Sequence, residues 1–315
     1  MANAVLSDPR FFSEEAAFDY VERMLWPEGP ICPHCGARGE KIGRLQGVRS
    51  KPSKKHPEGV EVIGLRKCYA CRGPAFTVRK GTIFEDSHLP LRLWLQAIHL
   101  LCASKKGIST RQLQRMLNCG MKTAWHLGHR IREIMKPTGD SGMGGEDKTI
   151  EADWTYVGRK PGIKVRKGVG HMRPVFALVE RDGTAQSVHV PNVSAENLSE
   201  AMKDASSKSH LMTDEAPVFN LVGFRFASHQ TVTHSKDEYV RGDVYTNTVE
   251  GFFSILKHGI YGVYQHISEA HLQRYLTEFD FRYSNRERLG VNDTARADRA
   301  LKGARGRRLT YQTTH

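Results

Sequence analysis

Residues 246–257, TNTVEGFFSILK, decide how the rest of the chain is interpreted, because they have the period of an amphipathic helix. At 100° per residue, Glu250 and Lys257 fall about 20° apart on one side, with Asn247 and Ser254 beside them. The opposite side is apolar and consists of Val249, Phe252, Phe253, Ile255 and Leu256. A helix with one apolar face packs on a sheet, so we expect Glu250 and Lys257 to face a groove together.

Two aspartates upstream lie where strands are expected. Residues 149–157, TIEADWTYV, read as a strand with Asp153 in its middle, and residues 211–215, LMTDE, read as a short strand that ends on Asp214. Residues 154–213 separate the two aspartates, and the 35 residues 215–249 separate Asp214 from Glu250. Three such carboxylates can hold two divalent cations about 3.5 to 4 Å apart, an arrangement suited to in-line attack on a phosphodiester.

Neighbouring residues leave the ligand set open. Glu151 shares a strand face with Asp153, and Glu215 adjoins Asp214, so either glutamate could take the place of its neighbour. Asn247 is a possible further ligand, since it lies on the helix face of Glu250 and its carbonyl oxygen can bind magnesium.

The order Asp, Asp, 35 residues, Glu and then Lys seven positions later resembles the DDE transposases, which have a ribonuclease-H-like core. The chain looks more narrowly like the ISXO-type insertion-sequence transposases with an N-terminal zinc ribbon, from Cys32 to about Arg288. Three segments carry that likeness: EADWTYVGRK at 151–160, HSKDEYVRGDVYTNTVEGFFSILKHGIYGVY at 234–264 and HLQRYLTEFDFRYSNR at 271–286.

The resemblance implies a DNA transposase that binds the terminal inverted repeats of an insertion sequence, hydrolyses a phosphodiester and transfers the strand to target DNA. It implies that Asp153, Asp214 and Glu250 hold two Mg²⁺ (or Mn²⁺) ions, with Lys257 also catalytic. It also implies a homodimer or larger assembly on DNA, in the bacterial cytoplasm with the nucleoid. His234, Tyr239 and Arg241 resemble family positions near the groove.

Two alternatives stay open. One is a catalytically inactive regulator that binds DNA through its ribbon and helix-turn-helix. The other is a ribonuclease-H-like nuclease or resolvase that cuts without joining strands.

Composition favours a polyanionic partner. The 315 residues include 47 Lys and Arg against 34 Asp and Glu, which gives a net charge of +13 and a pI near 9.5. We see no apolar run of membrane-spanning length and no signal peptide, so we expect a cytoplasmic protein without a membrane partner.

Four of the six cysteines form two CxxC pairs, CPHCG at 32–36 and CYACR at 68–72. Paired CxxC turns supply the tetrahedral thiolate shell of structural Zn²⁺, so we expect zinc on Cys32, Cys35, Cys68 and Cys71. Buried unliganded cysteines or a redox pair are the alternative. The basic insertion RSKPSKKH at 49–56 favours phosphate contact, although such a run is also typical of a solvated loop.

Residues 106–132 have the pattern of a helix-turn-helix, with helices over 109–117 and 121–135. An ordinary helical hairpin would give the same pattern. The candidate DNA contacts on the second helix are Lys122, Thr123, His126, Arg130 and Arg132.

The glycine-rich residues 136–148 indicate a hinge, and a basic loop after the first strand offers Lys160, Lys164, Arg166 and Lys167 to a phosphate backbone. Strands at 174–180, 185–190 and 211–214 and a helix at 194–205 follow the ribonuclease-H-like order, and residues 219–228 should pair near the sheet edge.

We therefore predict an α/β (α+β) multidomain chain. The expected parts are an N-terminal helix and zinc ribbon (1–80), a helix-turn-helix region (81–136), a linker (137–148), a ribonuclease-H-like mixed-sheet catalytic domain (149–290) and a basic tail (291–315) with the composition of a disordered segment.

Overall fold

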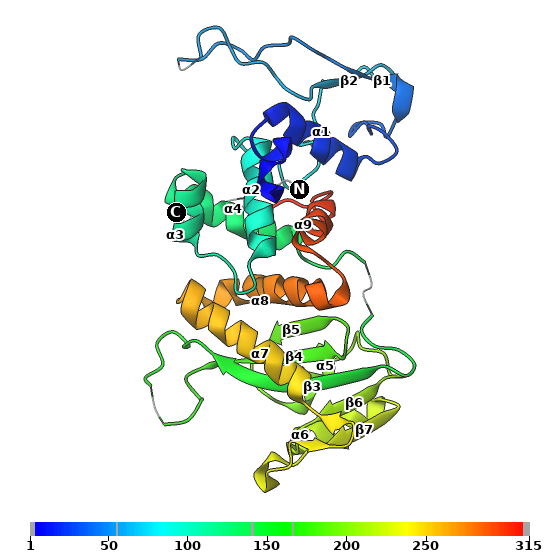
Figure 1. Cartoon of the computed structure of the whole chain (residues 1–315), viewed down its shortest axis with the longest axis vertical. Coiled ribbons are helices and arrows are strands. Elements are labelled where there is room, and N and C mark those ends of the chain that lie inside the picture. Colours follow the sequence, from blue (N-terminus) through cyan, green and yellow to red (C-terminus); the bar gives the residue numbers. More distant parts are fainter. Residues whose placement is uncertain (1–3, 55, 140–141, 166, 311–315) are drawn as a thin grey trace. The chain divides into compact units, whose positions relative to one another are not determined.

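The computed structural model describes residues 4–54, 56–139, 142–165 and 167–310 (Figure 1). The chain forms two compact units, each described by itself below. The first comprises Met1–Ala103, Thr110–Ile134 and Asp293–His315, and the second comprises Ser104–Ser109 and Met135–Asn292.

The second unit is built on a five-stranded mixed sheet of order β5-β4-β3-β6-β7. Its first three strands are antiparallel neighbours, whereas β6 runs parallel to β3 and β7 runs parallel to β6. This is the ribonuclease-H-like arrangement that the sequence predicts. The strands are β3 (Thr149–Val157), β4 (Arg173–Glu180), β5 (Ala185–His189), β6 (His210–Thr213) and β7 (Ser228–Thr231).

Helices cover both faces of this sheet, because alternate strand residues are apolar on each side. On one face, α7 (Asn247–Gly259) and α8 (Glu269–Ser284) pack on a layer that includes Val175 and Ala177. On the other face, α5 (Ala195–Ala201) and α6 (Pro217–Asn220) enclose a second core. That core contains Ile150, Ala152, Phe176, Leu178, Leu198 and Phe219.

The helix α7 is the amphipathic helix expected over residues 246–257. Val249, Phe252 and Leu256 are buried in its sheet-facing stripe. It ends at Gly259, where an added Cβ would lie 2.3 Å from the ring of Phe279, so this position requires glycine. A π-helical turn, Ile260–Tyr264, follows, and a short hairpin of β8 (Val240–Arg241) and β9 (Val244–Tyr245) precedes the helix.

The first unit is mainly helical. Ser13 caps α1, since its hydroxyl accepts a hydrogen bond from Ala16 N at 3.2 Å. The segment with the helix-turn-helix pattern forms a pair of helices whose turn contains Asn118, with a φ of 46°. The helices are α1 (Glu14–Leu25), α2 (Leu91–Ala103), α3 (Thr110–Leu117), α4 (Met121–Ile134) and α9 (Asp293–Lys302), and the strands are β1 (Ile42–Arg44) and β2 (Arg66–Cys68).

Short 3₁₀ turns complete the description. They are η1 (Val5–Ser7), η2 (Pro9–Phe11), η3 (Gly39–Lys41), η4 (Gly223–Arg225), η5 (His234–Lys236) and η7 (Glu287–Leu289).

Two sequence expectations about local structure are wrong. The basic tail is not irregular throughout, because α9 buries Ala297, Ala300 and Leu301 at helical spacing. Half of residues 219–228 belong to α6 and η4 rather than to the sheet, and the strand β7 begins only at Ser228.

Two further observations concern the glycine-rich segment and the membrane. Met143, within the segment interpreted as a hinge, is buried in the core beneath α5. Over the part of the chain that the structure describes, no helix has the length and apolar character needed to cross a bilayer.

Candidate active site and zinc site

The sheet places the two aspartates on neighbouring strands, with Asp153 in the middle of β3 and Asp214 directly after the end of β6. In the parallel pairing of β3 with β6, the last matched residues are Glu151 and Met212. Asp153 and Asp214 each lie two residues further along, and residues two apart in a strand point to the same face. Asp153 therefore shares the sheet face that α7 covers, and Asp214 follows the end of the adjacent strand.

Glu250 lies in the first turn of α7. Val249 and Phe253 bury the helix against the sheet, whereas the side chain of Glu250 is 46% exposed. Its Oε1 accepts a hydrogen bond from Thr246 Oγ1 at 3.0 Å and lies 3.6 Å from His234 Nε2. The sequence resemblance pointed to His234, but Thr246 was missed; its place at the start of the helix was the available signal.

Electrostatic effects connect Asp153 to the other proposed residues. Burial raises the pKa of Asp153 to about 7, and the carboxylates of Asp214 and Glu250 add to the rise. The backbone N–H of Trp154, which donates to Asp153 Oδ1 at 2.6 Å, and the ammonium group of Lys257 act in the opposite direction. Burial also raises the pKa of Asp214. The charged forms of these two aspartates are thus disfavoured relative to those of exposed aspartates.

A pocket of about 850 Å³ runs along α7. Asp153, Glu250 and Lys257 line it together, as the helix pattern suggested, whereas Asp214 does not contribute to the lining. Tyr261 and His258, which the sequence did not point to, extend the pocket beyond the carboxylates. The complete lining is Asp153, Trp154, Thr155, Glu250, Phe253, Ser254, Lys257, His258, Tyr261 and Gly262.

The chemistry of the donor set fits hard divalent cations. Carboxylate oxygens are the ligands that Mg²⁺ and Mn²⁺ prefer, and a cation would favour the ionised form of Asp153, which burial and the neighbouring carboxylates disfavour. The three carboxylates are not as tightly gathered as the cysteines described below. Of the residues with described positions, only those cysteines form a group of three or more potential ligands with every ligand atom within 4.8 Å.

The alternative ligands differ in whether their side-chain oxygens already accept hydrogen bonds and in how exposed they are. Glu151 is fully buried and accepts hydrogen bonds from Arg181 and from the first turn of α7. The carboxylate of Glu215 accepts the backbone N–H groups of His234 and Ser235, and its own N–H and these donors lower its pKa to about 2. Both carboxylates are therefore engaged elsewhere, whereas Asn247 is exposed at the first position of α7.

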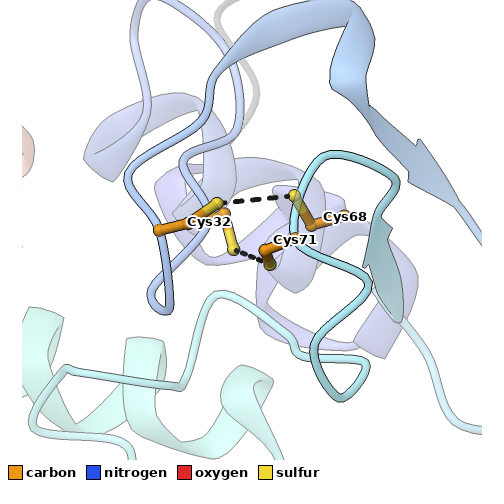
Figure 2. A group of neighbouring side chains, drawn as sticks. Cys32, Cys68 and Cys71 are labelled. Atoms are coloured by element: carbon orange, nitrogen blue, oxygen red, sulfur yellow. Dashed lines mark hydrogen bonds between the residues drawn. The ribbon is translucent and has the colours of Figure 1, made fainter.

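The four cysteines of the CxxC pairs meet in one cluster, and Figure 2 shows Cys32, Cys68 and Cys71 within it. Cys32 Sγ lies 3.8 Å from Cys71 Sγ, and Cys35 Sγ lies 3.7 Å from Cys68 Sγ. The backbone N–H of His34 points to Cys32 Sγ at 3.4 Å. Each pair lies in a tight turn next to β1 or β2, which is the geometry of a zinc ribbon.

The clustered thiols shift each other's pKa values. The N–H groups of Cys71 and Ala70 lower the pKa of Cys68 to about 7, which favours the thiolate. The N–H of Ala37 lowers the pKa of Cys35, but the neighbouring thiols outweigh it and raise that pKa to about 12. Crowded thiolates repel each other, so the set fits a soft divalent cation such as Zn²⁺.

The proposed DNA contacts on α4 divide into exposed and buried residues. Lys122 is exposed and Thr123 and His126 are half-buried, so these three remain candidates. The prediction for Arg130 is wrong, because its guanidinium is buried, donates to the carbonyls of Ile83 and Glu85 and stacks on a tryptophan ring. Arg132 is also buried.

The basic loop after β3 keeps its candidates. Lys164 and Lys167 are exposed, and Lys160 is half-buried. Arg166 lies outside the described residues.

The fold and the acidic pocket define a ribonuclease-H-like protein with a separate zinc-ribbon unit, and sequence comparison gives the particular family. Residues 144–284 match the ISXO2-like transposase domain, and residues 12–73 match the transposase zinc-ribbon domain. The chain therefore combines an ISXO2-like transposase domain with a transposase zinc-ribbon domain.

One relative and two solved structures are also similar to this chain. The relative is an uncharacterized protein in transposable element ISH50 of Halobacterium salinarum, 26% identical over 293 residues, which cover 86% of this chain and 91% of the relative. The Mos1 strand transfer complex is 12% identical with a TM-score of 0.27, and the match covers 66% of this chain and 73% of the Mos1 chain. A pre-cleavage Mos1 transpososome is 12% identical with a TM-score of 0.25, and the match covers 61% of this chain and 70% of the Mos1 chain.

Proposed function

We propose that this transposase binds the terminal inverted repeats of its element, cuts a phosphodiester at each end and joins the freed 3′ end to target DNA. The observation that carries the proposal is the position of Asp153, half-buried in the middle of β3, within the electrostatic influence of Asp214 and Glu250 and in one pocket with Glu250 and Lys257. Carboxylates gathered in this way are suited to hard cations.

Asp153, Asp214 and Glu250 are the residues that would hold two Mg²⁺ or Mn²⁺ ions. Bound there, such ions lower the pKa of an attacking hydroxyl and stabilise the leaving oxygen. Lys257 places a positive charge on the same pocket wall as Glu250 and attracts the phosphate to be cut. Thr246 orients Glu250 through its hydrogen bond to Oε1, and the buried stripe of α7 holds the helix against the sheet.

The remaining elements would bind the rest of the DNA. The start of α4 offers Thr123 and His126 to the base edges of the terminal repeats and Lys122 to a phosphate, because phosphate contacts position a protein and base contacts specify the sequence. Lys160, Lys164 and Lys167 would follow the backbone near the pocket. Cutting both ends together requires two active sites, so we expect a homodimer or larger assembly on DNA.

Zn²⁺ on Cys32, Cys35, Cys68 and Cys71 would have a structural role. The ribbon core around these residues is small, with only Ile42 and Phe76 as further buried apolar residues. A tetrathiolate site contributes directly to the stability of such a domain.

The test uses duplex oligonucleotides that carry the inverted repeats bordering the gene, incubated with the full chain and Mg²⁺ or Mn²⁺. We expect a 3′ hydroxyl at the element end, followed by joined products when target DNA is added. Cutting without joining would indicate a nuclease or resolvase, and repeat binding without cutting would indicate a regulator. Either result would overturn the proposal.

A further inference from the structure

A buried carboxylate in the second unit has no part in the proposed chemistry. Glu151 lies on β3, two residues before Asp153, and its side chain is inaccessible to solvent. It accepts four hydrogen bonds. The donors are Arg181 Nε at 2.7 Å, Thr248 N at 2.7 Å, Thr248 Oγ1 at 2.8 Å and Val249 N at 3.0 Å. A carboxylate with this many donors is fixed in place.

Three of these bonds come from the first turn of α7. A helix leaves its first N–H groups without partners, and a side chain at the N-cap usually accepts from one of them. Thr246 occupies that position, but its hydroxyl makes no capping bond and donates to Glu250 instead. The cap of α7 is therefore supplied by Glu151, about 97 residues earlier in the chain.

Arg181 also binds the segment that precedes α7. Besides its bond to Glu151, its guanidinium donates to Asp243 O at 2.7 Å and to Tyr245 O at 2.9 Å. It also lies over the ring of Tyr245, 3.5 Å from the centroid. The guanidinium thus fastens β9, the strand that leads into α7, to the carboxylate that caps the helix.

We propose that Glu151 is a positioning residue that sets the separation between Asp153 and Glu250. It joins the strand that carries one to the helix turn that carries the other, because Glu250 directly follows Val249, whose N–H bonds to Glu151. The inference rests on the proposed function, since it assumes that these carboxylates share cations. Groups that orient metal ligands typically change metal affinity or activity by about 10 to 100-fold when they are removed.

The chain offers a matched control. Asp280 on α8 is a second buried carboxylate that ties a helix to the sheet, and it accepts from Ser187 N at 2.9 Å and Ser187 Oγ at 2.6 Å. Both of these hydrogen bonds join α8 to β5, and neither involves a proposed ligand. Asp280→Asn should reproduce the general loss of stability without moving α7, whereas Glu151→Gln should act on the first turn of α7.

The first measurement is amide hydrogen exchange in the full chain without DNA. In Glu151→Gln we expect the amides of Thr248 and Val249 to exchange at least about tenfold faster than in the wild type, since hydrogen bonds to charged groups are strong. Asp280→Asn should leave these amides unchanged. Unchanged protection in Glu151→Gln would overturn the proposal.

The second measurement is the affinity of the zinc-loaded protein for Mn²⁺, which is monitored by the electron paramagnetic resonance signal of unbound Mn²⁺. We expect Glu151→Gln to weaken binding by about 10 to 100-fold and Asp280→Asn to leave it unchanged. Equal weakening by both variants, or by neither, would contradict a positioning role.

The third measurement separates this inference from the proposed function. Cutting by Glu151→Gln should need a higher Mn²⁺ concentration for half its maximal rate, while the affinity for DNA stays that of the wild type. A wild-type metal requirement would overturn the positioning role. If the wild type itself does not cut, the proposed function fails, and hydrogen exchange and Mn²⁺ binding still decide the role of Glu151.

Discussion

The zinc ribbon and the acidic pocket gather their ligands in different ways. In the ribbon, two local CxxC turns each supply a pair of thiols, and the four sulfur atoms lie together beside two short strands. At the acidic site, the carboxylates come from β3, from the residue after β6 and from α7, which are far apart in sequence, and they lie less closely together. Local turns can therefore place soft ligands with little core, whereas the acidic site depends on the whole sheet and on the packing of α7.

The largest expected effect concerns the acidic pocket. Asp153→Asn, Asp214→Asn and Glu250→Gln should each lower cutting of repeat-bearing oligonucleotides at least about 10³-fold, because each removes charge from the group that stabilises the reaction. Binding of the same DNA should persist in a gel-shift assay. A variant that cuts at the wild-type rate would remove its residue from the ligand set.

Metal removal should affect the two regions differently. A zinc chelator should release about one Zn²⁺ per chain and lower the melting temperature of the first unit, because its small ribbon core depends on the metal. The second unit should keep its melting transition, since its sheet is held by two apolar cores. Calorimetry with metal analysis measures both. No bound zinc together with an unchanged melt would refute the ribbon site.

A pH-dependent change in stability should arise from the buried carboxyl group of Asp280. Burial raises the pKa of Asp280 to about 8, although its bonds from Ser187 lower it. The folded state thus favours neutral Asp280, and the resulting stability is present below about pH 4 and is lost as the pH rises through about 8. The melting temperature of the wild type should fall relative to Asp280→Asn over this range. A pH-independent difference between the two proteins would count against the raised pKa.

The smallest effect should separate exposed from buried basic residues on α4. Lys122→Ala should weaken DNA binding and reduce the salt slope by about 1, as expected for loss of one phosphate contact. Arg130→Met should lower the melting temperature but leave the salt slope unchanged, because the guanidinium bonds to backbone carbonyls. Binding titrations at several salt concentrations test this, and equal slopes for Lys122→Ala and the wild type would exclude Lys122 as a phosphate contact.

Much of this architecture could be predicted because it follows local periodicity. The apolar stripe of α7, the alternation in β3 and the spacing of the CxxC turns are all visible in sequence. The role of Glu151 was not visible, because its partners are backbone N–H groups about 97 residues away. Arg130 was misinterpreted for a similar reason, since the carbonyls that bind it belong to a distant loop. The apolar spacing of α9 was present, but the basic composition around it concealed the helix.

The most direct test of the central claim is a metal switch at Asp153. Thiolate is a softer ligand than carboxylate and binds Mg²⁺ poorly, whereas Mn²⁺ accepts softer ligands more readily. We predict that Asp153→Cys binds repeat DNA normally, does not cut in Mg²⁺ and regains cutting in Mn²⁺. Wild-type cutting by Asp153→Cys in Mg²⁺, or no recovery in Mn²⁺ by the folded, DNA-binding variant, would contradict a cation on Asp153.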